Sequence, residues 1–170
     1  MMDTKRASWP WSIAKIISGG QTGADRAGLD WAIDHGIAHG GWCPRGRIST
    51  DGSIDNRYNL LETESTGYRQ RTRRNIESSD ATVIFMMGPL IGGSLLTYTL
   101  AEKLAKPVKV YQLAADDKSQ FYEVLDWLTQ EAPEVINVAG PSESRCPGTY
   151  QATYEALDRI FQCDVTLRLS

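Results

Sequence analysis

Hydrophobic and polar positions along the chain fall into two alternating patterns. Short apolar runs, most of them near-continuous and rich in β-branched residues, are typical of strands covered on both faces of a parallel sheet. Longer segments between them place apolar residues on one stripe at helical spacing. The predicted strands span residues 14–18, 37–42, 81–87, 108–113 and 135–139, and the predicted helices span residues 25–34, 68–78, 94–105, 118–130 and 148–162.

This alternation predicts the fold class. It favours an α/β, Rossmann-like, doubly wound and mainly parallel sheet of about five strands, flanked by helices and joined by right-handed crossovers. Residues 44–66 interrupt the alternation, and a stretch of this length without regular structure is usually functional or partly mobile. We expect one nucleotide- or cofactor-binding domain over residues 12–163, with residues 1–11 and 164–170 as terminal extensions.

Composition narrows the class of protein further. The 170 residues are 41% hydrophobic and 23% charged, as in an ordinary globular domain, and no apolar run approaches the roughly 20 residues that span a bilayer. A net charge of −3 argues against nucleic-acid binding. The three cysteines are widely spaced, without metal-type spacing to each other or to the histidines, so we expect free thiols, no metal site and a cytoplasmic location.

A glycine-rich segment, SGGQTGAD, lies directly after the first predicted strand and opens the first helix. Glycine lets a ligand approach the backbone closely, and a helix N-terminus offers unpaired N–H groups to an anion. The alternative is a tight strand–helix turn without a ligand. The candidate ligand contacts here are Ser18, Gly19, Gly20, Gln21, Thr22 and Gly23.

The same segment matches the dinucleotide fingerprint G-x-G-x-x-G only in part. Gly20 and Gly23 fit the second and third glycines, but Ser18 replaces the first. The second strand ends in Trp42-Cys43-Pro44-Arg45, where an NAD site would have an acidic residue for the ribose. A conventional NAD-dependent dehydrogenase is therefore disfavoured.

A second glycine-rich segment, MGPLIGGS, follows the third predicted strand. If the second strand lies on one side of the first and the third on the other, the first and third strands enclose the crevice where open α/β sheets bind ligands. The two segments then face each other, and their amides hold one phosphate group. We expect valine at Gly20 or Gly93 to abolish binding without unfolding the protein. The candidate contacts are Gly88, Gly92, Gly93, Ser94 and Thr97.

Other residues leave two interpretations open. Trp42 and Arg45 can offer a stacking face and a cation, or Trp42 can be packed in the core with Arg45 in solvent. Arg145 can reach an anion or lie in solvent. Cys43 is reactive only beside a group that lowers its pKa. We expect the arginines of residues 69–74 to be solvated or to face another subunit, and Asn75, on the inward stripe, can hydrogen-bond a ligand.

Five ordered motifs, covering about residues 13–161, carry a family resemblance: SGGQTGADRAGLDWA, GGWCPRGR, RNIESSDATVIF, GPLIGGSLLT and NVAGPSES with a following PGTY. The chain resembles the molybdenum-cofactor carrier family, which belongs to a wider Rossmann-like group with the cytokinin-activating phosphoribohydrolases, often named lysine decarboxylases. The resemblance implies a cytoplasmic homo-oligomer that binds molybdenum cofactor (molybdopterin) and can pass it to molybdoenzymes. It also implies a phosphate on Gly92, Gly93 and Ser94, with Trp42 shielding the heterocycle.

One departure from the phosphoribohydrolases bears on activity. Their motif P-G-G-x-G-T-x-x-E ends in a glutamate that assists glycosidic cleavage, whereas the corresponding position here is Thr99 and Glu102 lies nearly a helical turn further on. A general acid must come within hydrogen-bond reach of its proton. We therefore predict a carrier without catalytic residues. The alternatives are a phosphoribohydrolase-like nucleotide-processing enzyme and a sensor of nucleotide-derived signals.

Overall fold

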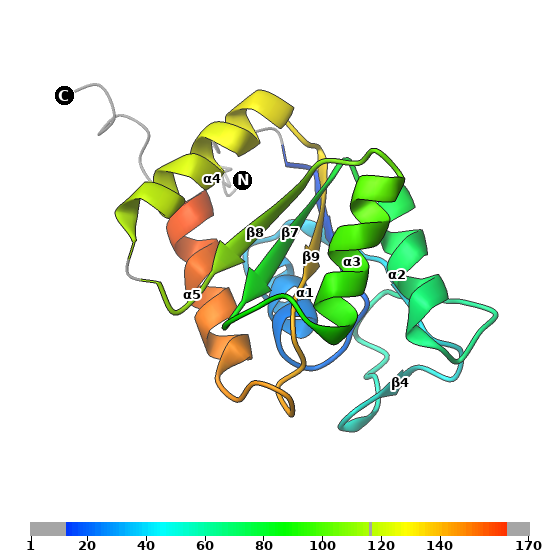
Figure 1. The fold of residues 1–170 in the computed structure, drawn as a ribbon. Helices are drawn as coiled ribbons and strands as arrows, with labels where there is room; N and C mark the ends of the chain where they lie inside the picture. Colours follow the sequence, from blue (N-terminus) through cyan, green and yellow to red (C-terminus); the bar gives the residue numbers. More distant parts are fainter. Residues whose placement is uncertain (1–12, 116, 163–170) are drawn as a thin grey trace, which may run out of the picture.

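A five-stranded parallel sheet forms the centre of the molecule (Figure 1). The computed structural model describes residues 13–115 and 117–162, so residues 1–11 and 164–170, expected to be terminal extensions, lie outside it. Every neighbouring pair in the sheet is parallel, which confirms the predicted α/β class. In spatial order the strands are β2 (Ala38–Gly40), β1 (Lys15–Ile17), β9 (Val135–Ala139), β7 (Ala81–Met86) and β8 (Val108–Gln112).

The order of the strands corrects one expectation. We expected the first and third predicted strands to enclose the binding crevice, but β9 lies between them. Ile136 of β9 is in register with Ile16 of β1 on one side and with Ala81 of β7 on the other. The apolar pattern identifies a buried strand but does not say which neighbours it pairs with, because parallel pairing joins segments far apart in the chain.

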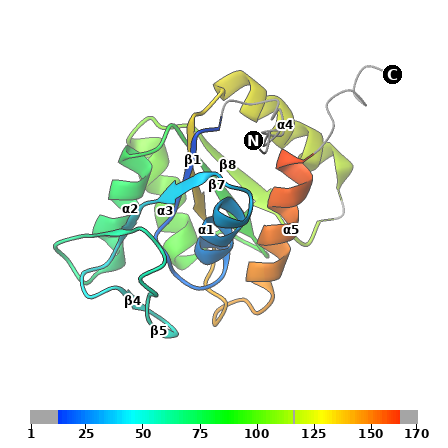
Figure 2. The ribbon, with the colours of Figure 1, turned by 180° about the vertical axis from the view of Figure 1, so that it is seen from behind.

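Helices cover both faces of the sheet (Figures 1 and 2). Alternate side chains of a strand point to opposite faces, so Phe85 joins the core beneath three helices, while its neighbour Ile84 faces the other side. The helices on the Phe85 side are α1 (Ala24–Asp34), α4 (Lys118–Glu131) and α5 (Thr149–Phe161). Those on the opposite side are α2 (Tyr68–Glu77) and α3 (Gly92–Lys103). Among the described residues, no helix combines the length and apolarity that a membrane crossing requires.

Residues 44–66, expected to be structureless, form short ladders among themselves and with residues 42–43. β3 (Trp42–Cys43) pairs in parallel with β6 (Leu61–Glu62), and β4 (Ile48–Ser49) forms a hairpin with β5 (Gly52–Ser53). Arg47 holds the segment together, because its guanidinium donates to the backbone carbonyls of residues 54, 55, 58 and 60 at 2.7–3.4 Å. Such side-chain bonds leave no periodic signal in the sequence.

Tyrosine–aspartate hydrogen bonds join α1 to α5. The Tyr150 hydroxyl donates to Asp30 at 2.6 Å and the Tyr154 hydroxyl donates to Asp34 at 2.7 Å. The bond to Asp34 raises the pKa of Tyr154 to about 12, because the carboxylate favours the protonated phenol.

The hydrogen bond between Tyr154 and Asp34 predicts that the thermal stability of the protein depends on pH. A tyrosine whose pKa is raised in the folded state stabilises the protein below its ordinary pKa of about 10, and this contribution is lost as pH rises through about 12. We expect Tyr154→Phe to lower the melting temperature below pH 10, and the difference from wild type to shrink between pH 10 and 12. Thermal unfolding of both proteins across this range measures it. A difference that is constant with pH would contradict the role of the Asp34 bond.

Candidate functional site

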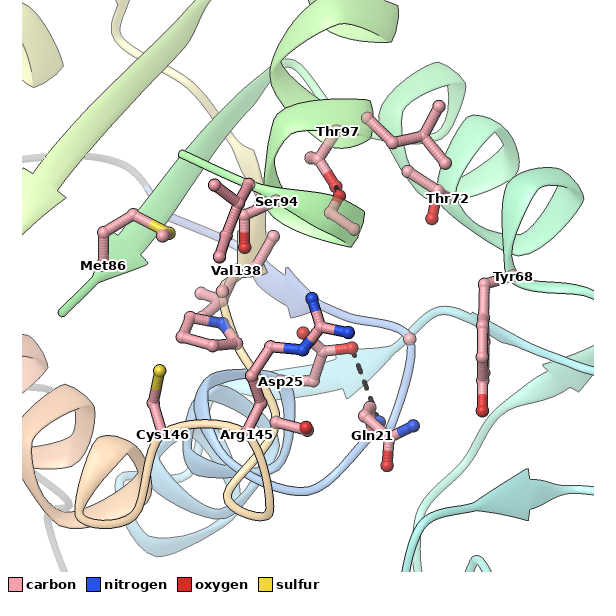
Figure 3. A pocket seen from close by; sticks show the side chains of 18 of the residues that line it. Gln21, Asp25, Tyr68, Thr72, Met86, Ser94, Thr97, Val138, Arg145 and Cys146 are labelled. Atoms are coloured by element: carbon pink, nitrogen blue, oxygen red, sulfur yellow. Dashed lines mark hydrogen bonds between the residues drawn. The ribbon is translucent and has the colours of Figure 1, made fainter. Parts of the chain in front are cut away.

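A cavity of about 260 Å³ lies at the carboxyl ends of the central strands (Figure 3). The loops that follow β1, β7 and β9 contribute to its wall, together with residues from the first turns of α2 and α3 and from the turns that follow them. Open α/β sheets bind their ligands at this edge. The lining residues are Gly19, Gln21, Asp25, Thr50, Tyr68, Arg71, Thr72, Asn75, Met86, Met87, Pro89, Ile91, Gly93, Ser94, Leu96, Thr97, residues 137–142, Arg145 and Cys146.

The start of α3 and Arg145 form an anion-binding corner of this cavity. The amides of Gly92, Gly93 and Ser94 belong to the first helical turn and have no carbonyl of the helix to bond, and Ile91 at the N-cap makes no side-chain hydrogen bond. The Arg145 guanidinium lies so close to Gly92 that a β-carbon there would collide with it. A positive helix end and a guanidinium together attract a negatively charged group.

Asp25 and Arg71 form a second charged pair in the wall of the cavity. Arg71 Nη1 lies 3.2 Å from Asp25 Oδ2, and their side chains are 13% and 9% exposed. A β-carbon at Gly19 would collide with Arg71, so glycine at this position lets the arginine cross the first loop. Burial raises the pKa of the Asp25 carboxyl above its ordinary value, and the nearby Arg71 offsets this only in part.

The position of Arg71 corrects our expectation that the arginines of residues 69–74 are solvated or face another subunit. Arg69, Arg73 and Arg74 are exposed as expected, whereas Arg71 points inward. The sequence held a signal for this position, because Arg71 lies three residues after Tyr68 and four before Asn75, on the same helical stripe. What it lacked was any indication of the partner, Asp25, which is 46 residues away.

Asn75, which we considered as a ligand contact, lies in the cavity wall but has backbone partners. Its Oδ1 accepts from the Trp42 amide at 2.8 Å and its Nδ2 donates to the Trp42 carbonyl at 2.9 Å. The side chain therefore fixes α2 against β3. Deeper in the wall, Asn137 donates to the Thr82 hydroxyl at 3.2 Å across neighbouring strands.

The structure brings together five of the predicted contacts. Gly19 and Gln21 of the first loop, and Gly93, Ser94 and Thr97 of α3, line the same cavity. Apart from Thr97, which follows the second, they come from the two glycine-rich segments, which are far apart in the sequence and which we expected to face each other across one site. Gly92 does not line the cavity itself, but its amide belongs to the α3 turn that Arg145 contacts.

The other candidates of the first loop have structural contacts elsewhere. The Ser18 hydroxyl donates to the Asp25 carbonyl at 2.8 Å. Gly20 has a positive φ of 73°, and a β-carbon there would be 2.6 Å from Leu60. Thr22 and Gly23 line a separate hollow with Tyr150.

Three more candidates lie away from the cavity. The Trp42 indole N–H donates to the Ser78 hydroxyl at 3.2 Å, so this ring packs on α2 and is not among the cavity-lining residues. Arg45 is exposed on its loop. The Gly88 backbone is bonded through both its amide and its carbonyl to the Gln112 side chain.

The structure also places two side chains that we considered for a chemical role, Cys43 and Glu102. Cys43 is fully buried, and burial raises the pKa of its thiol, which keeps the thiol protonated near neutral pH. Glu102 is exposed and is not part of the cavity lining. Within residues 13–115 and 117–162, no group of three or more His, Cys, Asp or Glu side chains is arranged to hold a metal ion.

Fold and cavity together define a Rossmann-like α/β protein with a pocket at the carboxyl ends of its central strands. The chain belongs to the circularly permuted YpsA SLOG family, whose model matches residues 16–161. It is also similar to a solved structure from Syntrophus aciditrophicus described as a putative molybdenum carrier protein, with 41% identity, a TM-score of 0.85, and coverage of 88% of this chain and 96% of that one. These findings confirm the family predicted from the five motifs. Curated proteins gave no match.

Proposed function

We propose that this protein binds a small phosphate-bearing molecule in the cavity, and that the molecule is molybdenum cofactor, which the protein carries and protects. The observation that carries the proposal is the anion-binding corner, where the amides of Gly92, Gly93 and Ser94 meet the Arg145 guanidinium. A terminal phosphate monoester is the kind of group that a helix N-terminus with an adjacent arginine binds well.

The remaining wall suits the rest of such a ligand. Met86, Met87 and Cys146 bring soft sulfur atoms to the cavity, and Figure 3 shows Met86 and Cys146 on the same side of it. Soft donors are compatible with a sulfur-rich, metal-bearing group. Tyr68, 46% exposed at the cavity wall and with the Arg71 guanidinium over its ring at 5.1 Å from the centroid, takes the place of Trp42 as the candidate aromatic contact for a flat heterocycle.

The relative's description supports the same ligand. The Syntrophus aciditrophicus protein is described as a putative molybdenum carrier protein, and it shares this fold over nearly its whole length. We propose a carrier because binding and release need only hydrogen bonds and charge, both of which the cavity offers. Transfer to molybdoenzymes, a homo-oligomeric assembly and a cytoplasmic location remain predictions from the family resemblance.

The proposal is tested by loading the protein with molybdopterin and measuring retention. We expect Arg145→Met to weaken binding roughly 10- to 100-fold, because it removes a charge-assisted bond to the phosphate and leaves the helix amides in place. Fluorescence of the oxidised pterin, after separation of free ligand, gives the bound fraction. Arg159→Met, an exposed arginine on α5, is the matched control and should bind as wild type does. Equal affinity in Arg145→Met and wild type would contradict the anion-binding corner.

A further inference from the structure

The cavity holds a second arginine, Arg71, which is ion-paired with Asp25 and whose guanidinium carbon lies 5.1 Å from the centroid of the Tyr68 ring. The bond is 3.2 Å long and involves one guanidinium nitrogen. Arg71 Nε is buried and has no hydrogen-bond partner. A buried guanidinium with an unused donor is poorly satisfied, because a buried polar group without a partner retains most of its desolvation cost.

Burial also disfavours the charged form of Asp25. The residue is 6% exposed, and its carboxylate accepts from the Gln21 amide at 3.4 Å besides Arg71. Burial raises the pKa of this carboxyl, and Arg71 is the largest of the influences that favour its charged form, ahead of the Gln21 and Gly19 amides and Arg26. If Arg71 turned to another anion, a second negative charge would lie beside the carboxylate in a buried wall. Protonation of the carboxyl removes that repulsion.

Among the described residues that line the cavity, Asp25 is the one with a carboxyl group. On the same helix as Asp25, Arg26 forms an ion pair with Asp51. From α2, the cavity wall includes Arg71 and Tyr68. From the loop after β9, it includes Arg145 and Cys146. Neither histidine lines the cavity. Arginine and tyrosine side chains do not ordinarily titrate between pH 5 and 8.

We propose that Arg71 is a second anion-binding residue, which Asp25 holds in an ion pair until an anionic ligand takes its guanidinium, and that the Asp25 carboxyl gains one proton from solvent in this exchange. The inference rests on the proposed function, since it requires an anion in the cavity. The only covalent change is the O–H bond formed on Asp25. Ligand affinity is then linked to pH, and a rise in pH favours release.

The test uses anions whose own charge is constant from pH 5 to 8, inorganic sulfate and the longer ethane-1,2-disulfonate, with affinity measured by calorimetry. In wild type, affinity for at least one of them should fall with rising pH, by up to about tenfold per unit when a whole proton is taken up. Asp25→Asn should bind more tightly than wild type at pH 8 and lose this slope. Arg71→Met should bind weakly and also without a slope. Asp51→Asn, which removes an arginine-paired carboxylate outside this cavity, should retain the wild-type slope.

Wild-type calorimetry in two buffers of different ionisation enthalpy counts the proton directly, so the test does not depend on the stability of a variant. Uptake near one proton per anion supports the exchange. Binding without proton uptake, or a slope that persists in Asp25→Asn, overturns the exchange and leaves the anion-binding corner intact. No binding of either anion at any pH would contradict the corner itself, and the exchange with it.

Discussion

Replacing Gly93 by valine is expected to abolish binding of a phosphate-bearing ligand while the protein remains folded. Gly93 lines the cavity and is exposed, and apart from its chain neighbours and the backbone of its own helix no atom lies within 4 Å of the position that a β-carbon would take. The fold therefore accepts the side chain, which projects into the space beside the α3 amides. A branched apolar group there excludes the phosphate and its hydrogen bonds, and we expect a loss of at least about 100-fold in affinity. Retention of molybdopterin and thermal unfolding measure the two effects separately.

Gly67→Val is the matched control for this variant. Gly67 directly precedes α2, and Gly93 is the second residue of α3. Gly67 does not line the cavity, and a β-carbon there would meet the Ser65 hydroxyl at 3.3 Å. It should bind ligand as wild type does. Wild-type affinity in Gly93→Val would remove the start of α3 from the site.

Gly20→Val does not provide the same test, contrary to our expectation from the sequence. Its φ of 73° is strained for a branched residue, and the side chain would press against Leu60 and Ile54. The variant is therefore expected to lose stability, and a loss of binding would not identify Gly20 as a ligand contact.

Arg47→Met is expected to lower the free energy of unfolding by about 3 kcal/mol and to expose residues 44–60 to proteolysis. The guanidinium bonds four backbone carbonyls, and hydrogen bonds from a charged donor contribute about 1.5–3 kcal/mol each when they are independent. These four share one side chain, so their sum is smaller. Urea denaturation gives the free energy, and limited trypsin digestion with mass spectrometry locates the cleavage.

Arg45→Met controls for the loss of a positive charge in the same segment. Arg45 is exposed, so its removal should change the free energy of unfolding by less than about 0.5 kcal/mol. If Arg47→Met were equally neutral, the four carbonyl bonds would not be what orders the segment. Arg47→Met is also expected to alter the cavity wall, because Thr50 of the same segment contributes to it.

The sequence by itself determined the helices and the strands of the central sheet, the fold class and the family. Runs such as residues 81–87 and 135–139 have enough β-branched and apolar side chains to identify buried strands, and helical stripes recur between them. The glycines after β1 and β7 marked two segments that do reach one cavity. These signals are local: each depends on residues within a few positions of one another, and local spacing is what a linear pattern records.

Tertiary structure alone decided how distant segments meet. It placed β9 between β1 and β7, paired Arg71 with Asp25, directed Arg47 to the carbonyls of its own loop and turned Trp42 away from the cavity. Each result depends on pairings between side chains or strands whose separation along the chain has no fixed period. The free energy of burying charges and closing the sheet selects these pairings only once the whole chain has packed.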